Sequence, residues 1–539
     1  MPIAETADCL SWGDTVFLNL ERNGMPLNVA GISILEGKIA FQQFVNFVES
    51  KLPLIPRYLK RVVPPPLNAG LPTWDFDRAF DIRNHVREVT LKHGTSSELK
   101  ALAGKILGTV MDREHPLWDM TLVHGLKGDR TGLIARMHHC LADGIAGVGI
   151  MSVFMDATPA PPPVPKRKSP LRVPRRDTVT SIVDGLACSY SNFLDRVLSG
   201  WADLLTITER TLTTGGNLDS EEVEELLPEL TAPTQRLCFN VIYRGPQKFA
   251  CTQVPLQDVK EIRKARGTSV NDVLLTLVAA TIRRYSEFHG DRLKGRCIRI
   301  MVPVNLRGNG SSAGVGNHIS LVAVTIPLDI RDPRKLLVAV HRKTEFLKQT
   351  HAAELVGLTA GLLGVLPNPL QAFAGPYISQ LPITPFNMVC TSVPGPQSPL
   401  YLLGHKMLEW YPYVPIGGEL ALNCAILSYD GGVYFGFSGD AHAAPDLPRL
   451  EKLLQENFTE LCVSAGIRAR TPRKKIPRKR SNKQKNPAIA PVPSPTPEVP
   501  ETRSVEEPIP LPSPARVMET TSNDRPIEKE KLTVLQQTA

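Results

Sequence analysis

The stretch RMHHCLADGIAG, Arg136 to Gly147, places two adjacent histidines four residues before an Asp-Gly pair. The preceding residues, TGLIARMHH, alternate in polarity and are rich in strand-forming side chains, whereas DGIAGVGIMSVFMDA has the pattern of a helix. Asp143 is well placed to cap that helix, because its carboxylate can accept the first free backbone N–H groups. The stretch therefore predicts a strand, a turn and a helix, with both histidines at the end of the strand.

Strand-like and helix-like patterns alternate in two regions of the chain. In the first region NVAGISILEG and LWDMTLVHGL are strand-like, while AFQQFVNFVESKL and SSELKALAGKILGTVM are helix-like. In the second, SVNDVLLTLVAATIRRYSEF is helix-like with Ser269 or Asn271 near its start, and the strand-like segments are RIMVPVNLR, HISLVAVTIPL, NMVCTSVPGP and ALNCAILSYDGGVYFGFSGD. We therefore predict an α/β fold built from two α+β sandwiches.

Proline-rich and charged segments set the expected boundaries. DATPAPPPVPKRKSPLRVPRR, residues 156–176, contains prolines that exclude helix and sheet interiors, and a helical connector is expected over residues 178–212. Beyond Arg468 the chain is rich in Pro, Lys, Glu and Ser, which predicts a disordered tail. The predicted parts are an N-terminal domain (1–155), a linker with connecting helix (156–231), a C-terminal domain (232–467) and a tail (468–539).

The net charge of +9 comes from two short segments. Arg468–Lys485 holds ten Lys and Arg with no acid, and Lys166–Arg176 holds six, so the rest of the chain carries −7. Such cationic segments suit an anionic surface, either membrane headgroups or nucleic acid, or act only as solubilising linkers. The tail lacks aromatic residues for base stacking, so we expect no nucleic-acid partner.

Cysteines and apolar segments indicate the compartment. Nine cysteines without a repeated CxxC spacing indicate no disulfide framework and fit a reducing environment. The N-terminus lacks a signal pattern, and apolar stretches such as VGLTAGLLGVL are too short to cross a bilayer. We therefore expect a cytoplasmic protein.

Three interpretations of the histidine pair are open. Successive strand residues face opposite sides, so only one of the two histidines can face a given cavity. In the simplest interpretation, one histidine is hydrogen-bonded within the structure and the other is exposed. A metal site is disfavoured because adjacent histidines diverge and no HExxH or cysteine cluster supplies further ligands. The third interpretation is general-base catalysis by an imidazole that titrates near neutrality.

Further motifs bear on this choice. HHCLADG matches the HHxxxDG signature of acyltransferases that use CoA or a carrier protein. With it occur PLW (Pro116–Trp118), Asn271–Asp272, PVNLR (Pro303–Arg307) and SVPGP (Ser392–Pro396). From LSWGDTVFLNLE to about Ile467 the chain resembles the bacterial wax ester synthase/diacylglycerol acyltransferase family, within the HHxxxDG superfamily.

The resemblance implies two chloramphenicol-acetyltransferase-like sandwiches that meet at a tunnel, with His139 as general base. His139 would deprotonate a diacylglycerol or long-chain alcohol, which attacks a long-chain acyl-CoA to give triacylglycerol or wax ester without an acyl-enzyme. His138, Asp143 and Gly144 would support the motif. Asn271 and Asp272 are candidates for oxyanion stabilisation or the domain interface, and helix capping is the alternative for Asn271. No metal or cofactor is expected, since acyl-CoA is a substrate. Because such lipid substrates are poorly soluble, the resemblance also implies peripheral association with membranes or lipid bodies.

Departures and rival functions complete the prediction. Asn28 stands in PLNV where the family often has a histidine, and PLW is expected to pack rather than to touch substrate. GSSAG (Gly310–Gly314) matches GxSxG formally but lies between strands, which disfavours a serine hydrolase. The alternatives are a carrier-protein-dependent condensing or acyl-transferring enzyme and a catalytically silent lipid-binding protein of the same fold.

Overall fold

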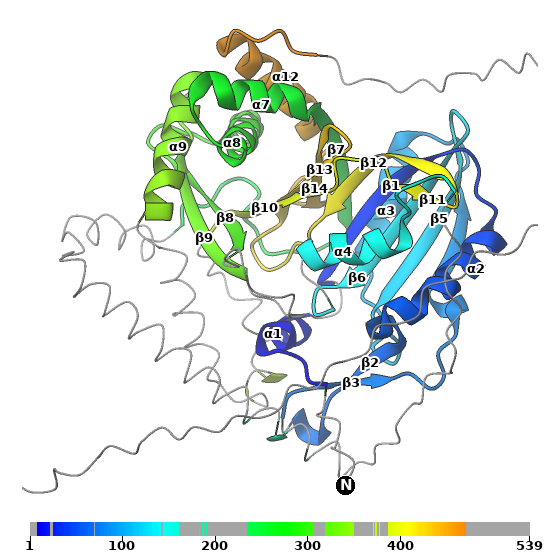
Figure 1. Ribbon diagram of the computed structural model, residues 1–539. Helices are drawn as coiled ribbons and strands as arrows, with labels where there is room; N and C mark the ends of the chain where they lie inside the picture. Colours follow the sequence, from blue (N-terminus) through cyan, green and yellow to red (C-terminus); the bar gives the residue numbers. More distant parts are fainter. Residues whose placement is uncertain are drawn as a thin grey trace, which may run out of the picture. The chain divides into compact units, whose positions relative to one another are not determined.

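The computed structural model describes residues 8–21, 25–68, 70–141, 144–160, 234–305, 319–349 and 386–470, with isolated helical positions at 183–190 and 370–377. Within these residues the chain forms two six-stranded sheets and a two-stranded hairpin (Figure 1). The strand predicted at RMHHCLADGIAG is part of the first of these sheets, and the predicted turn and helix follow it. Two residues of the turn, 142 and 143, lie outside the described residues.

The first sheet has the strand order β11-β12-β1-β6-β5-β4. β1 lies antiparallel between β6 and β12, and its register places Asn28 opposite His138. Its strands are β1 (Asn28–Glu36), β4 (Val86–Thr90), β5 (Trp118–Leu126), β6 (Arg130–His138), β11 (Tyr401–Leu402) and β12 (His405–Tyr413). The separate hairpin consists of β2 (Lys60–Val63) and β3 (Thr73–Phe76).

Capped helices accompany the first sheet. The Ser11 side chain accepts the backbone N–H of Asp14 and so starts α1, and Thr95 caps α3 in the same way. The helices are α1 (Trp12–Leu20), α2 (Phe41–Lys51), α3 (Ser96–Leu107) and α4 (Gly144–Phe154), with the 3₁₀ turns Leu52–Leu54, Pro56–Leu59, Pro66–Asn68 and Ile82–Asn84. Their buried apolar residues and those of the sheet form one hydrophobic core.

The second sheet has the order β7-β14-β13-β10-β8-β9, and four helices pack together over it (Figure 1). Its strands are β7 (Gln247–Pro255), β8 (Cys297–Asn305), β9 (Ile319–Pro327), β10 (Met388–Pro394), β13 (Leu422–Tyr429) and β14 (Gly432–Asp440). The helices are α7 (Leu256–Arg266), α8 (Val270–Phe288), α9 (Pro333–Gln349) and α12 (Arg449–Ser464). A second hydrophobic core lies between these helices and the sheet.

Strand exchange joins the two sandwiches. β11 and β12 belong to the second region of the chain by sequence, yet they extend the first sheet beyond β1. Glycines permit the close contacts this requires: a Cβ on Gly31 would lie 2.5 Å from Nε1 of Trp410 in β12. A Cβ on Gly436 of β14 would lie 1.8 Å from the Pro412 carbonyl oxygen. The linear domain boundaries stay a prediction, and residues 401–413 are structurally part of the first sheet.

Several sequence predictions can be compared with this fold. Each strand-like and helix-like segment quoted above contains a strand or helix of the predicted type. The predicted connector over 178–212 lies almost entirely outside the described residues, although Val183, Leu186, Ala187 and Tyr190 are helical. The tail beyond Arg470 also lies outside them. Across the described parts, no helix has the length and apolar character needed to span a bilayer.

The cysteines differ from expectation at one position. Cys9 is disulfide-bonded, whereas the other seven described cysteines are free thiols. Burial raises the pKa of the Cys140 thiol, next to the histidine pair, well above its ordinary value. A thiol held protonated in this way is a poor nucleophile, so Cys140 acts as a small buried side chain.

Candidate active site

The histidine pair lies where β6 ends and the chain turns toward α4. His138 is the last residue of β6, and its N–H donates to the Leu117 carbonyl at 3.0 Å. The His138 carbonyl then accepts the N–H of Leu141 at 3.0 Å, which closes a turn. α4 begins at Gly144, and Asp143 lies outside the described residues. The capping role predicted for Asp143 therefore stays a prediction.

His138 is completely buried, with 0% of its surface exposed. Its Nδ1 accepts the backbone N–H of Cys140 at 3.1 Å. Since Nδ1 accepts, the ring proton of neutral His138 resides on Nε2. That Nε2 lies 3.4 Å from Oε1 of Glu21, a distance for charge–dipole attraction rather than for a short hydrogen bond.

His139 is held differently and is only partly buried. Its backbone N–H donates to the Leu27 carbonyl at 2.9 Å. Its ring stacks on the ring of Phe17 in α1, with centroids 3.8 Å apart and an angle of 15° between the planes. The two neighbouring rings therefore occupy different environments, as strand alternation predicts.

Glu21, directly after α1, is a carboxylate that the sequence did not single out. Its side chain is 1% exposed; Oε1 accepts the Leu27 N–H at 3.1 Å, and Oε2 lies 3.0 Å from Nη2 of Arg113. Burial alone would raise the pKa of Glu21, but His138, the Leu27 N–H and Arg113 lower it to about 2. Glu21 is therefore ionised at neutral pH.

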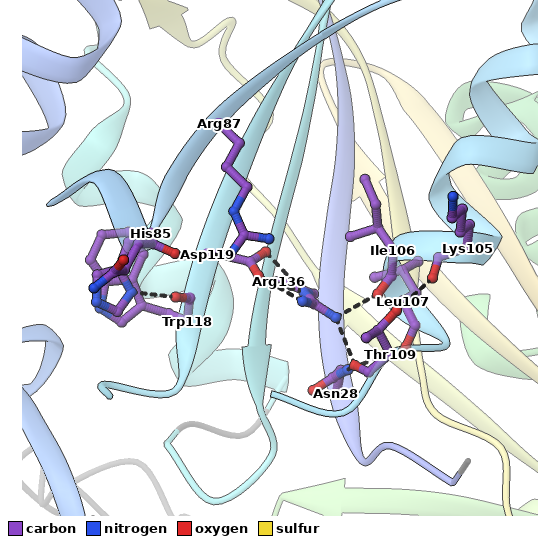
Figure 2. Close-up of polar contacts among 11 residues, drawn as sticks. Asn28, His85, Arg87, Lys105, Ile106, Leu107, Thr109, Trp118, Asp119 and Arg136 are labelled. Carbon is purple, nitrogen blue, oxygen red and sulfur yellow. Dashed lines mark hydrogen bonds and ion pairs between the residues drawn. The ribbon is translucent and has the colours of Figure 1, made fainter. Parts of the chain in front are cut away.

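A polar cluster anchors the strand that carries the histidines. Arg136, on the same face of β6 as His138, binds both carboxylate oxygens of Asp119 at 2.9 Å through Nε (Figure 2). Its Nη1 donates to the carbonyls of Ile106 and Thr109 beyond the end of α3. Because Arg136 and Asp119 are both buried, their bidentate pair fixes the guanidinium, whose Nη1 bonds then hold the end of α3 against β6.

Asn28, where the family often has a histidine, belongs to the same cluster. It is completely buried, and its Nδ2 donates to the carbonyls of Leu107 at 3.2 Å and Thr109 at 3.0 Å (Figure 2). The amide thus bridges the start of β1 to the end of α3. A buried side chain with these partners supports the strand rather than contacting a substrate.

Asn271 and Asp272 lie in the second sandwich, at the start of α8. Asp272 is completely buried and forms a capping box with Ser269. Its carboxylate also accepts Thr344 Oγ1 at 2.6 Å and lies 2.8 Å from His341 Nδ1, both from α9. Burial opposes ionisation, but Thr344, Ser269 and His341 lower the pKa of Asp272 below its ordinary value. Asp272 thus joins α8 to α9, while Asn271 is partly exposed.

Other predicted features are placed as follows. Trp118 of the PLW motif is buried, donates Nε1–H to the Tyr58 carbonyl at 2.8 Å and stacks on Tyr58, so it packs in the core. GSSAG lies outside the described residues. Among those that are described, no three His, Cys, Asp or Glu side chains gather as metal ligands. A cavity of about 10 Å³ between α8 and α12 contains neither histidine of the pair, and the tunnel stays a prediction.

Comparison with known proteins extends these observations. A family profile described as the wax ester synthase/diacylglycerol acyltransferase catalytic domain matches residues 10–274, and the C-terminal domain of that family matches residues 315–462. The probable diacylglycerol O-acyltransferase tgs1 of Mycobacterium tuberculosis H37Rv is 25% identical over 451 residues, covering 83% of this chain and 94% of the relative. The corresponding tgs2 is 27% identical over 470 residues, covering 85% and 100%.

Solved structures agree in fold. The wax ester synthase/diacylglycerol acyltransferase from Marinobacter aquaeolei VT8 has a TM-score of 0.60 at 23% identity, covering 85% of this chain and all of that one. A starter condensation domain of rhizomide synthetase has a TM-score of 0.54 at 12% identity, covering 86% and 96%. Similarity at this level of identity concerns the fold alone, and it confirms the predicted pair of mixed α/β sandwiches.

Proposed function

Since the chain belongs to the wax ester synthase/diacylglycerol acyltransferase family and is an acyltransferase, we propose that it transfers a long-chain acyl group from acyl-CoA to an acceptor hydroxyl. Diacylglycerol is the favoured acceptor, giving triacylglycerol, and long-chain alcohols, giving wax esters, are the second. The names of the two mycobacterial relatives support diacylglycerol.

One observation supports His139 as the general base: of the two adjacent residues, only His139 is partly exposed. A base must come within hydrogen-bond distance of the hydroxyl it deprotonates, and the completely buried His138 has no surface to offer. Stacking on Phe17 covers one face of the His139 ring and restricts its rotation. A general base in this position contributes about 10²–10⁴-fold to the rate.

The reaction then needs no covalent enzyme intermediate. His139 takes the proton from the acceptor hydroxyl as the oxygen attacks the thioester carbonyl carbon. The C–S bond of the tetrahedral intermediate breaks, and the departing CoA sulfur receives the proton from the imidazolium. Ester and free CoA are formed, and His139 returns to its neutral state. Water must be excluded, because hydrolysis of the thioester competes.

Supporting roles are proposed for the rest of the motif. Asp143 caps α4 and holds the turn, and Gly144 leaves room for the backbone to turn. Asn271 has an amide N–H that can stabilise the developing oxyanion. Asp272, an ionised carboxylate without a proton to donate, keeps the start of α8 in place.

An acceptor assay tests the proposed function. Purified protein is given radiolabelled palmitoyl-CoA with diacylglycerol, hexadecanol or an aminoacyl pantetheine thioester, each in a separate reaction. We expect ester from diacylglycerol and less from hexadecanol, with no amide, and no product from the His139→Gln variant. Product only from the pantetheine thioester would indicate a condensing enzyme, and no product with any acceptor would indicate a silent lipid-binding protein.

We also propose peripheral association with anionic lipid surfaces. The cationic segments Lys166–Arg176 and Arg468–Lys485 each offer about 1 kcal/mol per basic residue near an anionic leaflet. Co-sedimentation with phosphatidylglycerol vesicles should occur at low salt and be lost at high salt. Vesicles of phosphatidylcholine alone serve as the control, and equal binding to both kinds would refute an electrostatic attachment.

A further inference from the structure

The end of α1 contacts both histidines of the pair. Phe17 stacks on the ring of His139, and Glu21, which follows α1, lies at 3.4 Å from the ring of His138. The Glu21 N–H donates to the Phe17 carbonyl at 3.2 Å, so the two side chains are one helical turn apart and fixed relative to each other. A single short segment thus supports two neighbouring rings.

The backbone of Leu27 links Glu21 to the second histidine. Its N–H donates to Oε1 of Glu21 at 3.1 Å, and its carbonyl accepts the N–H of His139 at 2.9 Å. Oε1 is also the oxygen that faces His138 Nε2. One carboxylate oxygen therefore contacts the His138 ring directly and reaches the His139 backbone through the backbone of a single residue, Leu27.

Glu21 also faces the nitrogen of His138 that carries the proton. The Cys140 N–H donates to Nδ1, which leaves the Nε2–H to point at the carboxylate. Ring orientation and the turn at Cys140 are then coupled, because the ring accepts a hydrogen bond from the turn. Among the described residues the completely buried Nε2–H has no closer hydrogen-bond partner than this carboxylate oxygen at 3.4 Å.

Two side chains supply the charge interactions that lower the pKa of Glu21. His138 from β6 and Arg113 from the loop before β5 are the titratable groups that act on Glu21, and Arg113 contacts only the other oxygen, Oε2. Arg113 also donates to the Leu18 carbonyl of α1 at 2.7 Å. His138 and Arg113 thus lie against different oxygens of Glu21, so their contributions can be separated by substitution.

We propose that Glu21 is a positioning residue for acyl transfer: its Oε1 fixes the His138 tautomer and, through Leu27, the backbone of the general base His139. Glu21 has no contact with substrate in this role. The inference rests on the proposed function, because it assigns His139 as the base whose position matters. A base displaced by about 1 Å can lose about 10²-fold in rate.

Paired substitutions test the role of Oε1. Glu21→Gln keeps an oxygen that can face His138 and accept the Leu27 N–H, whereas Glu21→Ala removes it. We expect Glu21→Ala to lower kcat about 100-fold with KM within about threefold, and Glu21→Gln to restore kcat to within about fivefold of the unmodified protein. Equal losses in both variants, or kcat retained in a folded Glu21→Ala, would overturn the proposal.

Two matched variants separate positioning from stability. Arg113→Met removes the ion pair on Oε2 and should lower thermal stability while leaving kcat within about threefold. Glu114→Gln changes an exposed carboxylate next to Arg113 and should alter neither. If Arg113→Met lost as much kcat as Glu21→Ala, the ion pair rather than Oε1 would be responsible, and the proposal would be wrong.

A measurement without substrate distinguishes this inference from the proposed function. Selective ¹⁵N-histidine NMR of the unmodified protein, with His138 assigned from the spectrum of His138→Gln, reports which nitrogen is protonated. We expect the Nε2–H tautomer, and we expect Glu21→Gln to keep it. An Nδ1–H tautomer would refute the positioning role even in an active enzyme. If no acceptor yields ester but the tautomer is as expected, only the proposed function fails.

Discussion

Both sandwiches contain a buried carboxylate that holds a histidine, and the two pairs differ in use. In the first, Glu21 lies 3.4 Å from His138; in the second, Asp272 lies 2.8 Å from His341. By distance alone the second pair has the stronger contact, and His341 is 33% exposed, as a catalytic base could be. The roles of the two pairs are instead distinguished by the other contacts that each carboxylate makes.

The contacts of the Asp272 carboxylate are with residues of the helices that it holds together and with their cap. Its oxygens accept from the Ser269 N–H, the Thr344 hydroxyl and His341, and so tie the start of α8 to α9. Glu21 instead faces a turn whose next residue, His139, reaches the surface. A short carboxylate–histidine contact is therefore insufficient to identify a reactive site, since a buried helix cap can produce the same geometry.

The largest expected effect separates the two histidines by activity. His139→Ala should lower ester formation by at least about 10²–10⁴-fold, because the acceptor hydroxyl then has no base. His341→Gln should keep the rate within about threefold. Initial rates with radiolabelled acyl-CoA provide the measurement, and circular dichroism verifies that both variants fold. A large loss in His341→Gln with full activity in His139→Ala would reverse the assignment.

Removal of the Asp272 carboxylate should have the next largest effect, on stability. Asp272→Ala leaves His341 and the Ser269 N–H without their common acceptor, and we expect the free energy of unfolding to fall by about 4 kcal/mol. Urea unfolding followed by tryptophan fluorescence measures the change. Asp332→Ala, which removes an exposed carboxylate that accepts the Arg334 N–H near the start of α9, should cost less. Equal losses in the two variants would mean that the burial of Asp272 does not increase its contribution to the free energy of unfolding.

Local patterns predicted the elements but not their long-range contacts. Strand and helix periodicity indicated β1, β6 and α8 with nearly the observed bounds, and strand alternation predicted different surroundings for the two histidines. Periodicity carries no information on which strands pair across hundreds of residues, so the place of β12 beside β1 was not foreseen.

The same limit explains the residues missed at the candidate site. Glu21 and Phe17 lie within the quoted segment LSWGDTVFLNLE, but a single acidic residue after a helix is common and does not indicate a functional role. Their contacts with His138 and His139 span more than a hundred residues and depend on how α1 packs. Arg136 lay within the quoted motif, and only its buried position beside Asp119 reveals its anchoring role.

Acid should weaken the first pair in a defined range of pH. The pKa of Glu21 falls from 4.5 to about 2 on folding, so its ionised form stabilises the folded state by about 3 kcal/mol. Because the folded pKa is the lower one, this contribution is complete above about pH 5 and is lost as pH falls toward 2. The difference in unfolding free energy between the unmodified protein and Glu21→Gln should shrink over that range. A constant difference would show that the charge does not matter.

The smallest expected effect concerns the stability contributed by His341. One third of its side chain is exposed, so water replaces part of what is lost on substitution. In His341→Gln, Asp272 keeps its Ser269 and Thr344 donors and gains an amide N–H within reach, and we expect a loss of about 1 kcal/mol or less in urea unfolding. A loss as large as that of Asp272→Ala would mean that the ring itself joins α8 to α9. The second pair would then depend on its histidine as strongly as we propose the first depends on its carboxylate.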